Sequence, residues 1–238
     1  MILAALLASA QPFEVHGAAM NEDDNQLTSA RTEMVREQLL ARDITHPNVL
    51  DAMRRVQRHR FVPPSEQRHA YRDTPLPLSH GQTISQPYIV ALMTQLVRPR
   101  AEDRVLEVGT GSGYQAAVLA ELVEHVYTVE IEADLARTSA ERLRELGYDN
   151  VTVRHGDGYV GWAEQAPFDI IVATAAPESV PQPLLDQLNA GGRMVVPVGP
   201  THSVQELRLI EKDDDGKITT RTIAPVRFVP MRRGSTPE

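Results

Sequence analysis

Between Arg104 and Val198, short apolar runs alternate with helical runs, and this alternation limits the possible folds more than any other feature. Five runs have the length and β-branched content of buried strands: Arg104–Val108, Val126–Ile131, Val151–Arg154, Phe168–Thr174 and Arg193–Val198. Three helical runs lie between them: Gly113–Val123, Ala133–Leu146 and Pro181–Leu188. Because βαβ crossovers are right-handed, this order predicts an α/β fold with a doubly wound, mostly parallel sheet.

The two ends of the chain differ from this pattern. Leu207–Ile210 and Lys217–Val229 flank the turn sequence Asp213–Gly216, which predicts a C-terminal antiparallel strand pair. Metal binding by the three consecutive Asp residues of this turn is a weaker interpretation, and the scattered His residues show no metal-ligand spacing. We therefore predict no metal.

An N-terminal helical extension precedes the sheet. One helix is predicted from Thr28 to about Asp43, and a second follows with Thr45 as its cap and Pro47 in its first turn. The second helix ends in the basic run Arg54–Arg60, which fits a solvated helix end better than a phosphate patch. A proline-rich segment over 61–82 predicts an ordered loop, and a third helix is predicted from Ser85.

These elements predict one domain with two short tails. The domain spans 28–231, with a helical cap and substrate loop over 28–98 and a cofactor-binding core over 99–231. We expect residues 1–27 to be a flexible or signal-like segment, residues 232–238 to be a flexible tail, and the protein to be a monomer. Met1–Ala10 is apolar and ends in small residues, but no Lys or Arg precedes it, so we expect a cytoplasmic protein, with a periplasmic one as the alternative. No other segment predicts stable membrane association.

Composition excludes several chemistries. The 238-residue chain has no Cys, which excludes disulfides, a thiol nucleophile and thiolate metal sites. Its 24 Lys and Arg against 32 Asp and Glu, a formal charge of -8, disfavour a dedicated nucleic-acid binder, and we predict no nucleic-acid partner.

The segment Leu106–Tyr114, LEVGTGSGY, stands where a predicted strand gives way to a helix. Its glycines let a ligand approach the backbone closely, and the helix N-terminus offers unpaired N–H groups, although tight helix packing also explains such glycines. Glu130 ends the next strand, about 20 residues on, where a carboxylate can accept hydrogen bonds from both ribose hydroxyls. This pattern predicts an adenosine-containing cofactor. Tyr114 at the third glycine position of the dinucleotide fingerprint disfavours a nicotinamide enzyme.

These residues resemble S-adenosylmethionine-dependent methyltransferases. More narrowly, five segments resemble the protein-L-isoaspartate O-methyltransferase family: Gln82–Pro87 (QTISQP), His155–Gly158 (HGDG), Ala175–Pro177 (AAP), Leu188–Arg193 (LNAGGR) and Val226–Pro230 (VRFVP). The resemblance implies methyl transfer from S-adenosyl-L-methionine to the α-carboxylate of L-isoaspartyl residues in proteins and peptides, which starts their repair through a succinimide.

The resemblance also implies the site residues. Ser85 would position the substrate carboxylate, and Thr83, Ile84 and Ser85 would also contact the cofactor. Glu107 would lie near the cofactor's amino group, Glu130 at the ribose, and Asp157 and Gly158 at the adenine. The methionine and ribose end would be lined by Gly109, Thr110, Gly111 and Ser112.

Several alternatives stay open. Ser85 precedes Gln86-Pro87 and an apolar periodic run, so the pattern alone favours a helix N-cap over a role in binding substrate. Trp162 either covers the adenine or packs in the core. The acceptor could instead be a small acid or RNA, and a module that binds the cofactor without turnover is not excluded. Amine methylation of bases is disfavoured, because Thr174–Pro177 lacks the Asn or Asp followed by two prolines of those enzymes.

Overall fold

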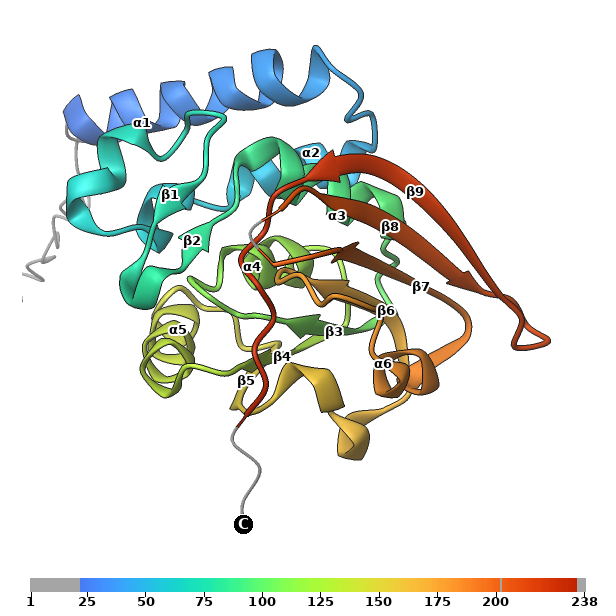
Figure 1. The fold of residues 1–238 in the computed structure, drawn as a ribbon. Coiled ribbons are helices and arrows are strands. Elements are labelled where there is room, and N and C mark those ends of the chain that lie inside the picture. The colour runs from blue at the N-terminus through green and yellow to red at the C-terminus, as the bar shows by residue number, and fades with distance from the viewer. Residues whose placement is uncertain (1–21, 202, 235–238) are drawn as a thin grey trace, which may run out of the picture.

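The structure is a computed structural model that describes residues 22–201 and 203–234. Within those residues the main feature is a seven-stranded sheet with strand order β5-β4-β3-β6-β7-β8-β9 (Figure 1). The strands are β3 (Arg104–Val108), β4 (His125–Glu130), β5 (Val151–His155), β6 (Phe168–Ala173), β7 (Leu188–Val198), β8 (Gln205–Lys212) and β9 (Ile218–Val226). Strands β3 to β7 pair in parallel, whereas β8 and β9 pair antiparallel, so the predicted fold class is confirmed.

The order of the strands creates a switch point in the middle of the sheet. The chain winds outward from β3 through β4 to β5, then returns to the other side of β3 for β6 and β7. Val108 at the end of β3 lies in register with Val129 of β4 and Ala173 of β6. Ligands of open α/β sheets bind outside the carboxyl ends of the strands at such a point.

Helices cover both faces of the sheet. They are α4 (Tyr114–Ala120), α5 (Ala133–Glu145) and α6 (Gln182–Gln187) within the core, and α2 (Pro47–Arg55) and α3 (Pro87–Val97) from the N-terminal part. Alternate residues of a strand point to opposite faces. Accordingly, Val105 joins a buried cluster that includes Met53 and Val97, and Leu106 joins a second cluster with Leu184.

The first helix starts earlier than the sequence predicts. Helix α1 (Glu22–Glu33) already begins at Glu22 rather than Thr28 and continues into a π-helical turn, η1 (Met34–Leu40). The polar α1 buries none of its residues, whereas η1 buries Met34, Val35 and Leu39. The apolar periodicity that marks a helix therefore begins only where this long helix meets the core.

Two predictions about the second helix are wrong. His46, not Thr45, is the N-cap of α2, and the Thr45 N–H donates to Gln95 Oε1 at 2.7 Å. The basic run is also not a solvated end throughout, because Arg58 is fully buried and its Nε donates to the Ala70 carbonyl at 2.7 Å. Burial lowers the pKa of Arg58 to about 10.

The proline-rich loop is ordered, as predicted, by short elements. They are the 3-10 turns η2 (Arg58–Phe61), η3 (Pro64–His69) and η4 (Ser79–Gly81) and the paired two-residue strands β1 (Leu76–Pro77) and β2 (Thr83–Ile84). Two further 3-10 turns, η5 (Gly158–Val160) and η6 (Ala163–Gln165), follow β5.

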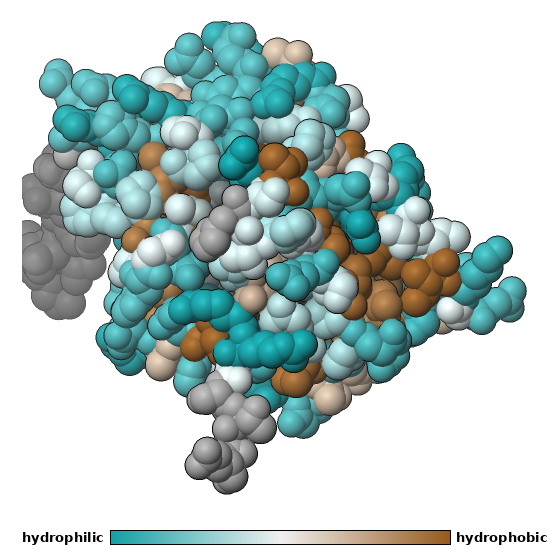
Figure 2. Space-filling model, viewed as in Figure 1, coloured by the Kyte–Doolittle hydropathy of each residue, from teal (hydrophilic) through white to brown (hydrophobic). Residues whose placement is uncertain are grey.

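The outer parts of the molecule are polar. Asp213 shapes the β8–β9 turn by accepting hydrogen bonds from the backbone N–H groups of Asp215 and Lys217. Hydrophilic side chains dominate the face in Figure 2, and apolar ones gather mainly toward the side where Figure 1 places β7 and β8. Within the described part of the chain, no helix has the length and apolarity needed to cross a membrane.

Candidate functional site

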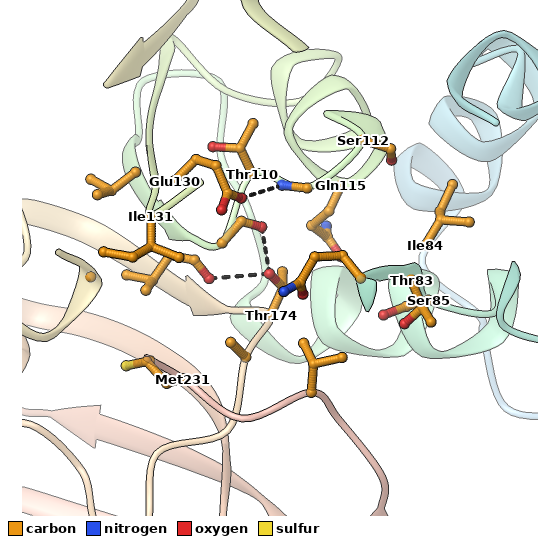
Figure 3. Close-up of a pocket in the computed structure, with 18 of the residues that line it drawn as sticks. Thr83, Ile84, Ser85, Thr110, Ser112, Gln115, Glu130, Ile131, Thr174 and Met231 are labelled. Atoms are coloured by element: carbon orange, nitrogen blue, oxygen red, sulfur yellow. Dashed lines mark hydrogen bonds between the residues drawn. The ribbon is translucent and has the colours of Figure 1, made fainter. Parts of the chain in front are cut away.

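A cavity of about 820 Å³, including its open mouth, lies at the carboxyl ends of β3, β4 and β6, at the switch point of the sheet. Nine of the predicted site residues line the cavity: Thr83, Ile84, Ser85, Gly109, Thr110, Gly111, Ser112, Glu130 and Gly158. Figure 3 shows Glu130 on one side, with Thr83 and Ser85 on the other. The structure thus brings together the glycine loop and a loop more than 20 residues before it.

At two glycines the backbone packs closely against side chains that line the cavity. Gly109 has a φ of 98°, and a Cβ there would come within 2.5 Å of Thr174 Oγ1. The Thr174 hydroxyl instead donates to the Gly109 carbonyl at 2.5 Å, which ties the glycine loop to the end of β6. A Cβ at Gly158 would overlap the Val108 side chain. Both positions need glycine for close backbone approach.

The Glu130 carboxylate lies at one end of the cavity and is fixed by two backbone N–H groups. Its Oε2 accepts the Gly111 N–H at 2.8 Å and its Oε1 accepts the Glu132 N–H at 3.0 Å. Each carboxylate oxygen can accept a second hydrogen bond, so the group can still bind two neighbouring hydroxyls.

Glu107 does not line the cavity, in contrast to the role implied for it. It is fully buried beneath the glycine loop, where its Oε2 accepts from the Thr128 hydroxyl at 2.5 Å. The Thr128 and Thr110 hydroxyls are in turn hydrogen-bonded to each other at 2.7 Å. Burial raises the pKa of Glu107 to about 8. The carboxyl group therefore reaches the cavity only through two threonine hydroxyls.

Asp157 also lies outside the cavity lining. Its Oδ1 accepts the Tyr159 N–H at 2.8 Å and its Oδ2 accepts the Gly234 N–H at 2.9 Å. The carboxylate caps the turn that carries Gly158 and holds the C-terminal segment.

Ser85 is not the cap of α3, which corrects the interpretation that its sequence context favours. The N-cap is Gln86, whose φ of -57° and ψ of 148° are extended. A proline disfavours helical geometry in the residue before it, so Pro87 prevents the helix from including Gln86. Ser85 is therefore one position too far away, and its hydroxyl has no hydrogen-bond partner within residues 22–201 and 203–234.

A second cavity, of about 1,420 Å³ including its open mouth, adjoins the first. It lies between α3 and the chain at the end of β9, and four residues line both cavities: Thr83, Ser85, Thr174 and Val229. The charged residues in its lining are Arg42 and Arg227, with no acidic residue among the described ones. Ser85 thus stands at the junction of two cavities.

Sequence reasoning missed several cavity residues. Val229–Arg232 cross the carboxyl ends of the strands (Figure 1), held by backbone hydrogen bonds of 2.8 Å from Ala176 N–H to Val229 and from Met231 N–H to Ala176. The VRFVP segment, which resembles the family, is the sequence signal that points to this part of the cavity. Gln115, held by Thr94 at 2.9 Å, carried no sequence signal.

Trp162 is half-buried and packs against the buried cluster of Leu106 and Leu184 rather than over the cavity. Its ring meets Tyr127 edge-on at 5.7 Å, with the Arg154 guanidinium 5.2 Å from its centre, and it is absent from the cavity lining. In the described part of the chain, no three His, Asp or Glu side chains gather into a possible metal site.

Comparisons with known proteins find relatives along nearly the whole chain. The family model for protein-L-isoaspartate(D-aspartate) O-methyltransferases matches residues 29–236. Protein-L-isoaspartate O-methyltransferase 2 of Syntrophobacter fumaroxidans is 54% identical over 227 residues, 92% of each chain. The protein-L-isoaspartate O-methyltransferase of Opitutus terrae is 56% identical over 217 residues, which cover 91% of this chain and 93% of the relative.

Solved structures of similar proteins share the fold. A protein-L-isoaspartate O-methyltransferase structure matches with a TM-score of 0.73 and 27% identity over 86% of this chain and 65% of its own. A Plasmodium falciparum structure described as the same enzyme, in complex with S-adenosyl-L-homocysteine, also has a TM-score of 0.73, with 26% identity over 86% of this chain and 99% of its own.

Proposed function

This chain belongs to the protein-L-isoaspartate(D-aspartate) O-methyltransferase family, and from that premise we infer what each part of its site does. The enzyme transfers a methyl group from S-adenosyl-L-methionine to the α-carboxylate of L-isoaspartyl residues in damaged proteins and peptides. The resulting ester cyclises to a succinimide, and hydrolysis of the succinimide returns part of the chain to normal aspartyl linkage.

The residues of the first cavity fit this cosubstrate. Gly109 and Gly158 pack their backbone closely against Thr174 and Val108, and Glu130 offers acceptors for a ribose diol. We propose that Gly109–Ser112 hold the methionine and ribose end, and that Gly158 meets the adenine. When bound, S-adenosylmethionine supplies a methyl group on a sulfonium centre. The leaving group is the neutral thioether that remains after the methyl group is transferred.

We propose that the protein's own contribution is alignment. A carboxylate is ionised at neutral pH and needs no general base. Holding it in line with the methyl carbon, with water kept away, can supply most of the acceleration. The Ser85 hydroxyl is a donor that can hold one carboxylate oxygen without accepting its charge, and Thr83 lines the same junction.

The observation that carries this assignment is the position of Ser85. Its hydroxyl has no partner in the described part of the chain, and the residue lines both cavities. We propose that the isoaspartyl segment occupies the second cavity, so that its carboxylate reaches Ser85 from the side opposite the cosubstrate.

The test is labelled methyl transfer to an L-isoaspartyl peptide, with the matching L-aspartyl peptide as control. We expect labelling of the isoaspartyl peptide alone. Ser85→Ala should lower kcat by about 10²-fold while leaving cosubstrate affinity nearly unchanged, because one positioned donor is lost. Ser79→Ala is the matched control, since Ser79 is exposed on the same loop and lines neither cavity. Equal labelling of both peptides would contradict the activity, and unchanged kinetics of Ser85→Ala would contradict its role.

The basic run on which the RNA alternative depends is only partly available. Arg54 pairs with Asp51 at 2.5 Å, Arg55 pairs with Glu121 at 2.6 Å, and Arg58 is buried. Arg60 is exposed and has no ion pair among the described residues.

We propose a monomeric, cytoplasmic enzyme whose residues 28–231 act as one domain. The described residues of a single chain line both cavities, and one buried cluster joins Met53 of the N-terminal part to Val105 of the sheet. Residues 1–10, on which the periplasmic alternative rests, lie outside the described residues. Light scattering and cell fractionation test these two points.

A further inference from the structure

We propose that Asp73 is a positioning residue for methyl transfer, which acts by holding Ser85 at the junction of the two cavities. This inference rests on the proposed role of Ser85. Asp73 lines neither cavity, so it would not touch the cosubstrate or the substrate carboxylate.

The start of α3 needs a cap that its own residues do not supply. Gln86 occupies the N-cap position without a side-chain cap hydrogen bond, and the Tyr88 N–H belongs to the first turn, where helices leave donors unpaired. Asp73 Oδ1 accepts this N–H at 3.1 Å from 15 residues upstream. A carboxylate at this end of a helix is also favoured by the helix dipole. Asp73 thus does what the sequence pattern assigns to Ser85, and the serine hydroxyl stays unpaired.

The other oxygen of Asp73 fixes the residue next to Ser85. Asp73 Oδ2 accepts from Gln86 Nε2 at 3.2 Å and from Arg42 Nη1 at 2.9 Å. The Arg42 guanidinium lies 3.3 Å from the centre of the Tyr88 ring, and the Tyr88 hydroxyl donates to Asp43 at 2.7 Å. The end of the N-terminal helix, Asp73 and the start of α3 are therefore linked through one carboxylate.

The same segment also holds the other side of Ser85. Three residues after Asp73, strand β1 pairs with β2, placing Leu76 opposite Ile84 and Pro77 opposite Thr83. Residues 73–77 therefore contact the chain both before and after Ser85. Because Ser85 is bracketed by these two attachments, its backbone cannot shift without breaking one of them.

This arrangement predicts a kinetic effect that a purely structural residue would not have. If alignment supplies the acceleration, a small displacement of Ser85 lowers turnover, while the glycine loop that holds the cosubstrate stays in place. Asp73→Ala should therefore lower kcat about 10- to 100-fold, with the KM for S-adenosylmethionine changed less than about threefold.

The decisive experiment is a double-mutant cycle with Asp73→Ala and Ser85→Ala, in which kcat is measured on the isoaspartyl peptide. Because Asp73 acts through Ser85, we expect Asp73→Ala to cause less than about a twofold further loss in the Ser85→Ala background. Equal losses in both backgrounds would overturn the inference. If Ser85→Ala itself has no effect, the proposed function of Ser85 fails instead, so the two failures are distinguishable.

Two further variants separate positioning from loss of folding. Asp43→Ala removes a carboxylate that bonds the Tyr88 hydroxyl but not the helix N-terminus, so its kcat should stay within about twofold of the wild type. Asp73→Asn keeps an oxygen for the Tyr88 N–H and should retain more turnover than Asp73→Ala. Near-ultraviolet circular dichroism at the assay temperature identifies any unfolded variant. An Asp43→Ala enzyme as slow as Asp73→Ala, with both folded, would contradict the inference.

Discussion

Glu107 is a fully buried carboxyl group whose pKa is raised to about 8, mainly by burial. The unfolded chain loses this proton near pH 4.5, whereas the folded chain keeps it until about pH 8. Between these values the folded state binds more protons, so the free energy of unfolding falls as pH rises and levels off above pH 8.

Glu107→Gln removes this titration and keeps the shape of the side chain. Across this window the wild type loses about 1.4 kcal/mol of its free energy of unfolding for each pH unit, whereas the variant does not. We therefore expect the free energy of unfolding of the variant, relative to that of the wild type, to rise by several kcal/mol between pH 4.5 and pH 8. Urea unfolding at a series of pH values measures the difference. Parallel curves for the two proteins would contradict a buried, protonated Glu107.

Ser85 offers a stability test that is independent of catalysis. Because its hydroxyl has no partner among the described residues, Ser85→Ala should change the free energy of unfolding by less than about 0.5 kcal/mol. Loss of a true N-cap costs about 1 kcal/mol, and Asp73→Ala should cost at least that much. Denaturant unfolding of the two variants compares them directly. A larger cost for Ser85→Ala than for Asp73→Ala would return the cap to Ser85.

At the scale of elements, the β3–α4 turn works only in contact with the end of β6. Thr174 donates to the Gly109 carbonyl at 2.5 Å, and Gly109 has a positive φ of 98°. The glycine loop is therefore shaped by a strand 65 residues further along the chain as well as by its own sequence.

Gly109→Ala should weaken cosubstrate binding, because the new Cβ displaces Thr174 and with it the loop. We expect a loss of stability of about 1–3 kcal/mol and a weaker thermal shift with S-adenosyl-L-homocysteine. Gly147→Ala is the matched control: it has a φ of 83° but nothing within 4 Å of the new Cβ. It should lose stability through backbone strain and keep its response to the ligand. The same ligand response in both variants would refute the role of close packing at Gly109.

On the scale of the whole molecule, the charge of the second cavity is opposite in sign to the net charge of the chain. The chain carries a formal charge of -8, yet the charged residues that line the second cavity are Arg42 and Arg227 among those described. Arg42 is paired with Asp73, whereas Arg227 is exposed and has no ion pair within residues 22–201 and 203–234. The mouth of this cavity should attract acidic segments to an otherwise acidic protein.

Arg227→Glu should therefore raise the KM for isoaspartyl peptides with acidic flanking residues by about two- to tenfold and lower it for basic ones. Arg221→Glu is the control, because it changes the net charge by the same amount at an exposed site on β9 outside both cavities. It should have little effect on the KM of either peptide. Because exposed charges are screened, the difference should shrink at high salt. Identical KM values for acidic and basic peptides in the Arg227→Glu enzyme would exclude this preference.

Features that depend on short stretches of backbone could be predicted from the sequence. The strand Arg104–Val108 has the predicted bounds, and the order of strands and helices defined the parallel sheet. The glycine loop followed by Glu130 indicated an adenosine-containing cosubstrate, because close backbone approach and a ribose acceptor need specific residue types at fixed spacing. Such requirements are local, so the pattern expresses them directly.

Tertiary structure decided which side chains are free and which are occupied. Glu107 and Asp157 lie outside the cavity lining, Arg58 is buried, and Asp73 rather than Ser85 caps α3. Each of these outcomes depends on a partner distant in sequence, such as Tyr88 for Asp73 or Ala70 for Arg58. Hydrophobic periodicity carries no information about such pairs. Only the folded chain, in which partners distant in sequence meet, determines that the Ser85 hydroxyl remains available for a substrate.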